Sequence, residues 1–288
     1  MPSPSANQSS RNPLLSSTRD RRRRTPLALR LARGARVFFH ALHGIATIAL
    51  LFPRAEASRR QALIKSWSRA LLAMLRIETR VEGIDVDALA GNLLIVANHI
   101  SWLDVFVLHS LRPSRFIAKS ELRDWPLLGH LIVGSGTLFL ERGRRRDTHR
   151  INGHAREVLA AGDTIAIFPE GTTTDGTEVL PFHGSLLQPI IDARGHLQPV
   201  AIRYCGPDRS YNDAPAYVGE TSFVECLWRI LGERRMVVEV TLGRTLETSG
   251  RHRRALAREA EEIIRVAVLA PALDSESGKY DDRRASPR

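Results

Sequence analysis

The chain has 288 residues, enough for one substantial α/β domain with an accessory segment and too few for two large domains. With 43% apolar and 25% charged residues its composition is globular, which points to neither a polytopic membrane protein nor a disordered one. The net charge of +11 indicates an anionic partner: nucleic acid, an anionic lipid surface or a phosphorylated small molecule. Because aromatic residues make up only 6% and do not interleave with the basic stretches, we expect no nucleic-acid partner.

Both ends of the chain lack an apolar period. Residues 1–24 are rich in Ser, Asn, Pro and Arg, and residues 271–288 in Asp, Ser and Arg, so we predict a disordered tail at each end, the first one basic. Cys205 and Cys226 have neither metal-site nor disulfide spacing. They predict a reducing compartment and two small, buried apolar side chains.

Residues 25–78 are predicted to form two membrane-associated helices. The first stretch, 37–52, is apolar over 16 residues, fewer than the roughly 20 that a spanning helix needs. The second, 59–75, places apolar side chains at helical spacing among basic ones. Joined at Pro53, the two would form a hairpin that dips into one leaflet. Two alternatives stay open: both helices pack on the core, or the first belongs to a secretory signal, since small residues spaced as at a cleavage site follow it.

Residues 79–270 show short apolar strands alternating with helical stretches. Strands are expected at 93–97, 116–118, 137–140, 164–168, 198–204 and 236–242. Helices are expected at 101–110, 126–133, 148–161, 184–193 and 250–270. The alternation predicts an α/β fold with a mixed, largely parallel sheet flanked by helices, preceded by the N-terminal helical hairpin.

The segment VANHISWLDVF begins where a buried strand ends, at the sheet edge where open α/β folds place their sites. If His99 lies in the loop and a helix begins at Ser101, Asp104 falls in the first helical turn and its carboxylate reaches back to the imidazole. It would then fix the tautomer, so that the other ring nitrogen takes a proton from a hydroxyl. A helix-capping pattern beside a structural histidine fits the same residues, and about half a match to this spacing is expected by chance.

Two further strand ends carry polar residues. AIFPEGTTTDG places Glu170 between a stiff proline and a flexible glycine, and its threonines offer hydroxyl and N–H groups to a phosphate or glycerol headgroup. An ordinary turn is the alternative. GTLFLERGRRRD places Arg142 at a strand end, where a guanidinium can bind phosphate through two hydrogen bonds. The arginines after it are expected to face membrane or solvent.

Together these segments resemble the motif blocks of the glycerolipid acyltransferase family. NHISWLD resembles its Asn-His-x-x-x-x-Asp block, GTLFLER its Gly-x-x-Phe-x-x-Arg block, FPEGTTT its Phe-Pro-Glu-Gly-Thr block, and QPV at 198–200 its Val-Pro-Val block. The likeness extends from about residue 37 to residue 242 and is greatest to bacterial lysophosphatidic-acid (1-acyl-sn-glycerol-3-phosphate) acyltransferases. Glu141 and Gln198 depart from the family pattern, which leaves the His/Asp pair untouched.

The resemblance makes 79–270 an acyltransferase domain and implies roles for its motif residues. His99 would be the general base and Asp104 its orienting carboxylate. The implied substrate-binding residues are Asn98, Arg142, Glu170, Gly171, Thr172 and Thr173.

The implied reaction is direct attack of a lysophosphatidic-acid hydroxyl on an acyl-CoA or acyl-carrier-protein thioester, without metal or cofactor. Phosphatidic acid for phospholipid biosynthesis would form at the cytoplasmic face of the inner membrane, on an anionic surface. Lyso-ornithine lipid or another lysolipid is the alternative acceptor. A non-catalytic protein that coats anionic membrane is the alternative of another class.

Overall fold

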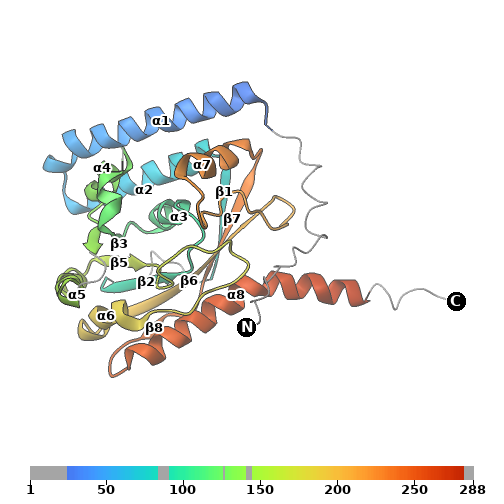
Figure 1. Cartoon of the computed structure of the whole chain (residues 1–288). Coiled ribbons are helices and arrows are strands. Elements are labelled where there is room, and N and C mark those ends of the chain that lie inside the picture. Colours follow the sequence, from blue (N-terminus) through green and yellow to red (C-terminus); the bar gives the residue numbers. More distant parts are fainter. Residues whose placement is uncertain (1–24, 84–90, 126, 141–144, 282–288) are drawn as a thin grey trace, which may run out of the picture.

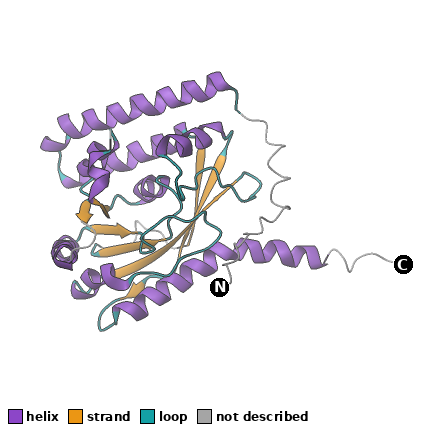
Figure 2. Cartoon of the chain, viewed as in Figure 1, coloured by secondary structure: helices purple, strands orange, loops and turns teal. Residues whose placement is uncertain are grey.

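The computed structural model describes residues 25–83, 91–125, 127–140 and 145–281. The predicted tail at 1–24 and the predicted phosphate ligand Arg142 lie outside these ranges. Figure 1 shows a sheet with helices on both of its faces, and Figure 2 shows long loops crossing one end of the strands.

The described strands form a single mixed sheet. They are β1 (Ile77–Gly83), β2 (Leu93–Ala97), β3 (Arg115–Lys119), β4 (Leu138–Leu140), β5 (Thr164–Ile167), β6 (His196–Cys205), β7 (Met236–Leu242) and β8 (Leu246–Glu247). Their order is β1-β7-β6-β2-β5-β3-β4, with β8 paired to β6 off this path. The β6–β7 and β6–β8 pairs are antiparallel and the other described pairs are parallel. The predicted mixed, largely parallel sheet is therefore confirmed.

Helices cover both faces of this sheet. They are α1 (Leu27–Leu50), α2 (Ala57–Met74), α3 (Leu103–Leu111), α4 (Leu128–Gly134), α5 (Arg145–Ala160), α6 (Gln188–Asp192), α7 (Phe223–Gly232) and α8 (Arg253–Asp281), with 3₁₀ turns η3 (Phe52–Arg54), η5 (Ser120–Asp124) and η6 (Gly184–Leu187). In Figure 1, α1, α2, α3, α4 and α7 lie on one side of the sheet, and α5, α6 and α8 lie on the other.

The central strand β2 shows why these residues form a two-sided core. Leu93, Ile95 and Ala97 belong to the apolar cluster shared with α2, α3 and α7. Leu94 and Val96 belong to the cluster shared with α5, α6 and α8. Since side chains alternate between the two faces of a strand and both faces are covered, β2 is apolar throughout. Its carboxyl end is consequently a fixed point from which the next residues project.

Several boundaries differ from those predicted from the sequence. Strands 93–97 and 236–242 are confirmed, whereas β1, β8 and α7 were not predicted. The helix expected at 184–193 divides into η6 and α6, with Pro189 in the first turn of α6. Helix α8 continues to Asp281, past the boundary expected at residue 270. Both cysteines are buried and free, as predicted.

The predicted helical pair is present, and α1 also packs on the domain along its length. A Cβ at Gly44 would lie 2.7 Å from the Trp67 indole nitrogen, and one at Gly134 of α4 would lie 2.5 Å from Ile48, so glycine permits both close approaches. His40 and Trp67 tie α1 to α2 by two 3.0 Å hydrogen bonds, each between one residue's ring nitrogen and the other's carbonyl oxygen. Even so, only 22% of the apolar window of α1 is buried. The helix is long and apolar enough to cross a membrane by length and composition.

Candidate active site

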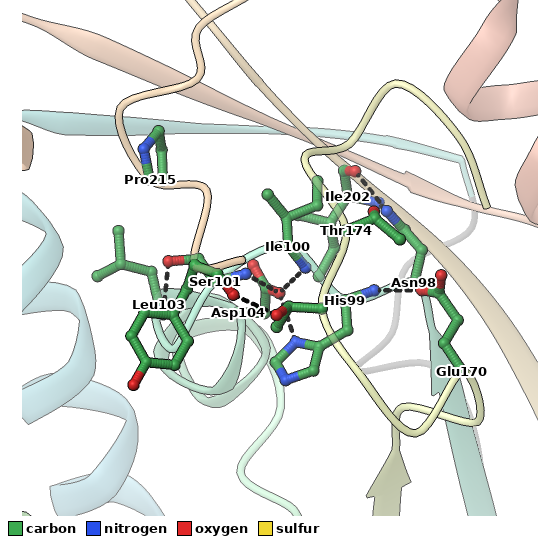
Figure 3. Close-up of polar contacts among 12 residues, drawn as sticks. Asn98, His99, Ile100, Ser101, Leu103, Asp104, Glu170, Thr174, Ile202 and Pro215 are labelled. Carbon is green, nitrogen blue, oxygen red and sulfur yellow. Dashed lines mark hydrogen bonds and ion pairs between the residues drawn. The ribbon is translucent and has the colours of Figure 1, made fainter. Parts of the chain in front are cut away.

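The first motif leaves β2 through Asn98, whose side chain is fully buried. Its amide oxygen accepts a hydrogen bond from the Ile202 N–H at 2.8 Å, and its amide nitrogen donates to the Ile202 carbonyl at 3.0 Å (Figure 3). Both polar groups of the side chain are thus used to join the loop to β6. The side chain therefore holds the backbone in place, and the substrate contact expected for Asn98 stays a prediction.

His99 and Asp104 meet as the sequence predicts. Helix α3 begins at Leu103, so Asp104 lies in its first turn and its Oδ2 is 2.8 Å from His99 Nδ1. The same Oδ2 accepts from the backbone N–H groups of Ile100 at 2.7 Å and Ser101 at 2.9 Å (Figure 3). The Asp104 side chain is 0% exposed, and these donors compensate for its lost hydration. Since a carboxylate only accepts, Nδ1 carries the proton and Nε2 of neutral His99, whose side chain is 22% exposed, can act as a base.

Phe168, the residue after β5, supports the imidazole from one side. The two ring centroids are 3.9 Å apart and the rings are inclined by 7°. This contact follows from the parallel pairing of β2 and β5, in which Val96 is in register with Ile167, so both strands end at the same edge. The histidine is therefore held by a carboxylate at one nitrogen and an aromatic face across its plane.

Tyr204 binds the other carboxylate oxygen of Asp104 and was not singled out from the sequence. It lies in β6, is fully buried, and donates its hydroxyl to Asp104 Oδ1 at 2.8 Å. Burial, followed by the charge of Asp104, raises the pKa of Tyr204 well above its ordinary value, so it stays a donor. A tyrosine inside an apolar strand gives no sequence signal of such a role, because the partner is 100 residues away.

Tyr204→Phe is expected to lower kcat for acyl transfer about tenfold with little change in KM. Removing the hydroxyl leaves Asp104 Oδ1 buried without its donor, which loosens the carboxylate and makes it a stronger acceptor for the His99 N–H. The acid limb of the pH–rate profile should consequently move to higher pH. Tyr211→Phe is the matched control, since it removes a hydroxyl that donates to the Asp175 carbonyl at the surface. A stability loss without a shifted pH profile would contradict the positioning role.

Glu170 is turned inward and joins the two motif loops. It is buried; its Oε1 accepts from the His99 backbone N–H at 2.6 Å and its Oε2 accepts from the Leu180 N–H at 2.8 Å. A further bond runs from the Thr174 N–H to the His99 carbonyl at 2.8 Å. Glu170 therefore positions the backbone of His99, and the substrate contact expected for it stays a prediction.

The charge of Glu170 predicts a pH dependence of stability. Burial raises its pKa from 4.5 to about 6, and the hydrogen bonds from Leu180 and His99 only partly oppose this. The folded state thus binds the proton more tightly, so the stabilisation is fully present below pH 4.5 and is lost as pH rises through about 6. The loss is about 2 kcal/mol. Urea unfolding across this range should show the change in wild type and in the exposed control Glu220→Gln, and a smaller change in Glu170→Gln.

The other residues of this loop differ in exposure. Gly171, with a φ of +71°, and Thr172 are exposed at the carboxyl edge of the sheet, where a ligand can reach them. The Thr173 hydroxyl donates to the Tyr217 carbonyl, so that residue holds the loop between β6 and α7. Tyr217 in turn donates its N–H to the Ile100 carbonyl at 2.9 Å. Of the three, Gly171 and Thr172 remain the candidates for substrate contact.

Lys119 is a cation at the same edge that the sequence reasoning missed. It is the exposed last residue of β3 and is in register with Leu140 of β4, two residues before Arg142 in the sequence. Strand β3 also pairs with β5, so Lys119 leaves the sheet on the side of the His99 loop. Its position directly after the strand expected at 116–118 was the available signal. By contrast, Gln198 is buried, donating to the Gly243 carbonyl at 2.7 Å and accepting from the Thr245 hydroxyl at 2.7 Å, so this departure from the family pattern is structural.

An apolar cavity of about 210 Å³ adjoins His99. Its walls come from α1, α2, α3, α4 and β3 and include Trp67, Phe106, Phe116 and Leu131. A base that can deprotonate a hydroxyl therefore lies beside a space suited to a hydrocarbon chain. Fold and site together define an enzyme of the class that transfers acyl groups to hydroxyls with a His/Asp pair.

Comparison with known proteins agrees with that class. Residues 78–203 match the family model Acyltransferase. The chain is 38% identical to lyso-ornithine lipid O-acyltransferase of Pseudomonas aeruginosa over 218 residues, 76% of this chain and 83% of the relative. It is 36% identical to 1-acyl-sn-glycerol-3-phosphate acyltransferase of Neisseria meningitidis over 216 residues, 75% of this chain and 84% of the relative.

A solved structure shares the fold. It is the 1-acyl-sn-glycerophosphate (LPA) acyltransferase PlsC from Thermotoga maritima, with a TM-score of 0.61 and 22% identity over 83% of this chain and 98% of that chain. The chain belongs to the acyltransferase family and is an O-acyltransferase. The family resemblance drawn from the motif blocks is confirmed.

Proposed function

We propose that the protein transfers a fatty acyl group from an acyl-CoA or acyl-carrier-protein thioester to the free hydroxyl of lysophosphatidic acid, forming phosphatidic acid. The observation that carries the proposal is the 2.8 Å contact between His99 Nδ1 and Asp104 Oδ2, with the imidazole lining the apolar cavity. The relative from Neisseria meningitidis, named for this acceptor, supports the choice.

The mechanism follows from the protonation state of the pair. Nε2 of His99 takes the proton of the acceptor hydroxyl as its oxygen attacks the thioester carbonyl. The new ester C–O bond forms, the C–S bond breaks, and the imidazolium returns its proton to the departing thiolate. Asp104 stabilises the imidazolium through Nδ1 while it exists. This sequence needs no metal, cofactor or covalent enzyme intermediate.

Substrate binding divides between the cavity and the carboxyl edge of the sheet. The apolar cavity suits the acyl chain of the donor. Lys119, Arg142 and the exposed backbone of Gly171 and Thr172 are the candidates for the acceptor phosphate. Helix α1, whose apolar window is 22% buried, would keep the domain on the cytoplasmic face of the inner membrane, where both lipids are present.

A second acceptor, lyso-ornithine lipid, is favoured by the 38% identical relative from Pseudomonas aeruginosa. It lacks a phosphate, so the cationic groups would lose their proposed partner. Membranes containing the expressed protein should be offered labelled acyl-CoA and acyl-carrier-protein thioesters with each acceptor, beside His99→Ala. Phosphatidic acid made only by wild type supports the proposal, and product from the aminolipid alone would move the acceptor.

Charge-reversal variants test whether the cationic side chains recognise the acceptor phosphate. Lys119→Glu and Arg142→Glu should each weaken transfer to lysophosphatidic acid far more than to lyso-ornithine lipid, because only the first acceptor carries a phosphate. Arg265→Glu on α8, across the sheet, is the matched control for an added negative charge. Equal losses with both acceptors would contradict phosphate recognition at this edge.

A further inference from the structure

The outer face of α1 presents apolar side chains to solvent over the whole length of the helix. Leu27, Leu31, Phe39 and Leu50 are all more than half exposed. An apolar surface this long is unfavourable in water and is typical of a helix that lies in the interface of a bilayer. Figure 1 shows α1 as the outermost helix on its side of the sheet.

Helix α7 lies against the N-terminal half of α1 in a fixed orientation. The Thr25 N–H donates to the Gly232 carbonyl at 3.3 Å. The buried Arg33 guanidinium donates to the Leu231 carbonyl at 3.3 Å and the Glu233 carbonyl at 2.8 Å. These bonds satisfy carbonyls at the C-terminus of α7, where a cation is also favoured by the helix dipole. The two helices therefore form one rigid surface.

Helix α7 carries exposed apolar side chains of its own beside α1. Val224 is 72% exposed, and Trp228, four residues later on the same side of the helix, is also exposed. The guanidinium of Arg30 lies 4.2 Å from the centre of the Trp228 ring. A tryptophan stacked on an arginine combines an apolar body with a cation, the combination that favours the headgroup level of a bilayer.

The opposite end of α7 adjoins the cavity. The ring of Phe223 lies 4.9 Å from that of Trp102 and 6.0 Å from that of Trp125, and both tryptophans line the cavity beside His99. The Arg229 guanidinium donates to the Ala216 carbonyl, next to Tyr217, another cavity residue. One short helix thus connects the apolar outer surface with the aromatic rim of the site.

We propose that α7 is a third membrane-contacting element, and that the surface formed by α1, Val224 and Trp228 rests on an anionic lipid bilayer. The occupant is assigned from the exposed apolar side chains that α1 and α7 carry side by side and from the exposed Arg36 of α1, whose charge complements anionic headgroups. Lipid substrates then reach His99 from the bilayer alongside the packed aromatic rings of Trp102, Trp125 and Phe223. This route rests on the proposed function; the contact surface does not.

The test compares Val224→Glu with Val266→Glu. Both valines are exposed, at 72% and 57%, but Val266 lies on α8 across the sheet. Binding to phosphatidylcholine vesicles with and without phosphatidylglycerol is measured by flotation. Val224→Glu should weaken binding about tenfold, since a carboxylate at the interface opposes both apolar and anionic contact. Val266→Glu should bind as wild type, and Trp228→Ala, which adds no charge, should weaken binding severalfold.

Activity provides the second measurement. With lysolipid in vesicles Val224→Glu should transfer acyl groups more slowly than wild type, and with lysolipid in detergent micelles the two should be equal. Equal vesicle binding by Val224→Glu and Val266→Glu would overturn the proposal. The proposal would also be overturned if light scattering showed a wild-type dimer and Val224→Glu abolished this dimer without affecting vesicle binding. If Val224→Glu weakens vesicle binding but the wild-type protein is inactive on every acceptor, the membrane-contacting surface is supported and the proposed function is rejected.

Discussion

Replacing His99 by alanine is expected to lower kcat/KM for acyl transfer about a thousandfold, the typical contribution of a positioned general base. The reason is geometric. Nδ1 is engaged by Asp104 at 2.8 Å, so only Nε2 can accept the hydroxyl proton, and among the described residues that line the cavity the other histidine is His109. Burial lowers the pKa of His109 to about 4, so its ring is neutral. However, the ring packs edge-on against Phe116 and its Nδ1 already accepts from the Ser114 N–H. His109 therefore does not replace His99.

The measurement is initial rate with saturating donor and varied lysolipid, on protein shown by circular dichroism to be folded. His154→Ala is the matched control, because His154 is an exposed histidine on α5, on the other side of the sheet. It should keep the wild-type rate. Residual activity within tenfold of wild type in His99→Ala would reject the general-base role.

Asp104→Asn is expected to lower kcat about a thousandfold while the protein stays folded. Three donors face Oδ2, namely the His99 Nδ1–H and the N–H groups of Ile100 and Ser101, so the amide oxygen must occupy that position. The amide nitrogen then faces Tyr204, whose hydroxyl can turn to accept from it. Geometry survives, but the negative charge that stabilises the imidazolium is gone.

An amide nitrogen that faces Tyr204 would also depend on the tyrosine hydroxyl as its acceptor. In Asp104→Asn/Tyr204→Phe the amide nitrogen would be buried without an acceptor, at a cost of about 1–3 kcal/mol. Tyr204→Phe should therefore destabilise the Asp104→Asn protein by about this amount, measured by urea unfolding of the single and double variants. Asp192→Asn, a surface carboxylate that accepts from Gln188, is the control for a loss of charge alone. An Asp104→Asn protein that loses no stability on Tyr204→Phe would contradict the predicted reorientation of Tyr204.

Some features of the fold and site follow from local sequence, whereas others depend on contacts between residues far apart in the chain. Strand β2 was placed correctly because a strand covered on both faces must be apolar throughout. Asp104 was placed in the first turn of α3 because local spacing determines that contact. By contrast, the backbone contacts of Asn98 and Glu170 were not predicted, since the groups that bind a ligand are the same groups that bind backbone. Only the burial and partners of each side chain separate the two roles.

The elements that were missed differ in the signal they offered. Strand β1 reads IETRVEG, and its second half is exposed at the sheet edge, so it lacks the apolar pattern of an inner strand. Helix α7 did carry a signal. Ser222 accepts from the Glu225 N–H at 3.2 Å, and a serine followed three residues later by glutamate is a helix-start pattern. Tyr204 offered none, because its role depends on which strand lies beside β2.

The contacts that build the His99 loop have a consequence for the order of folding. His99 and Glu170 are 71 residues apart, Asp104 and Tyr204 are 100 apart, and Asn98 and Ile202 are 104 apart. Contacts between such distant residues form late, because closing long loops of unfolded chain costs conformational entropy. During synthesis α1 and α2 leave the ribosome long before residue 204, so they can reach a lipid surface before the His/Asp pair is assembled. On the proposed function, the growing chain would thus lie beside its lipid substrates while it is still unable to activate a hydroxyl.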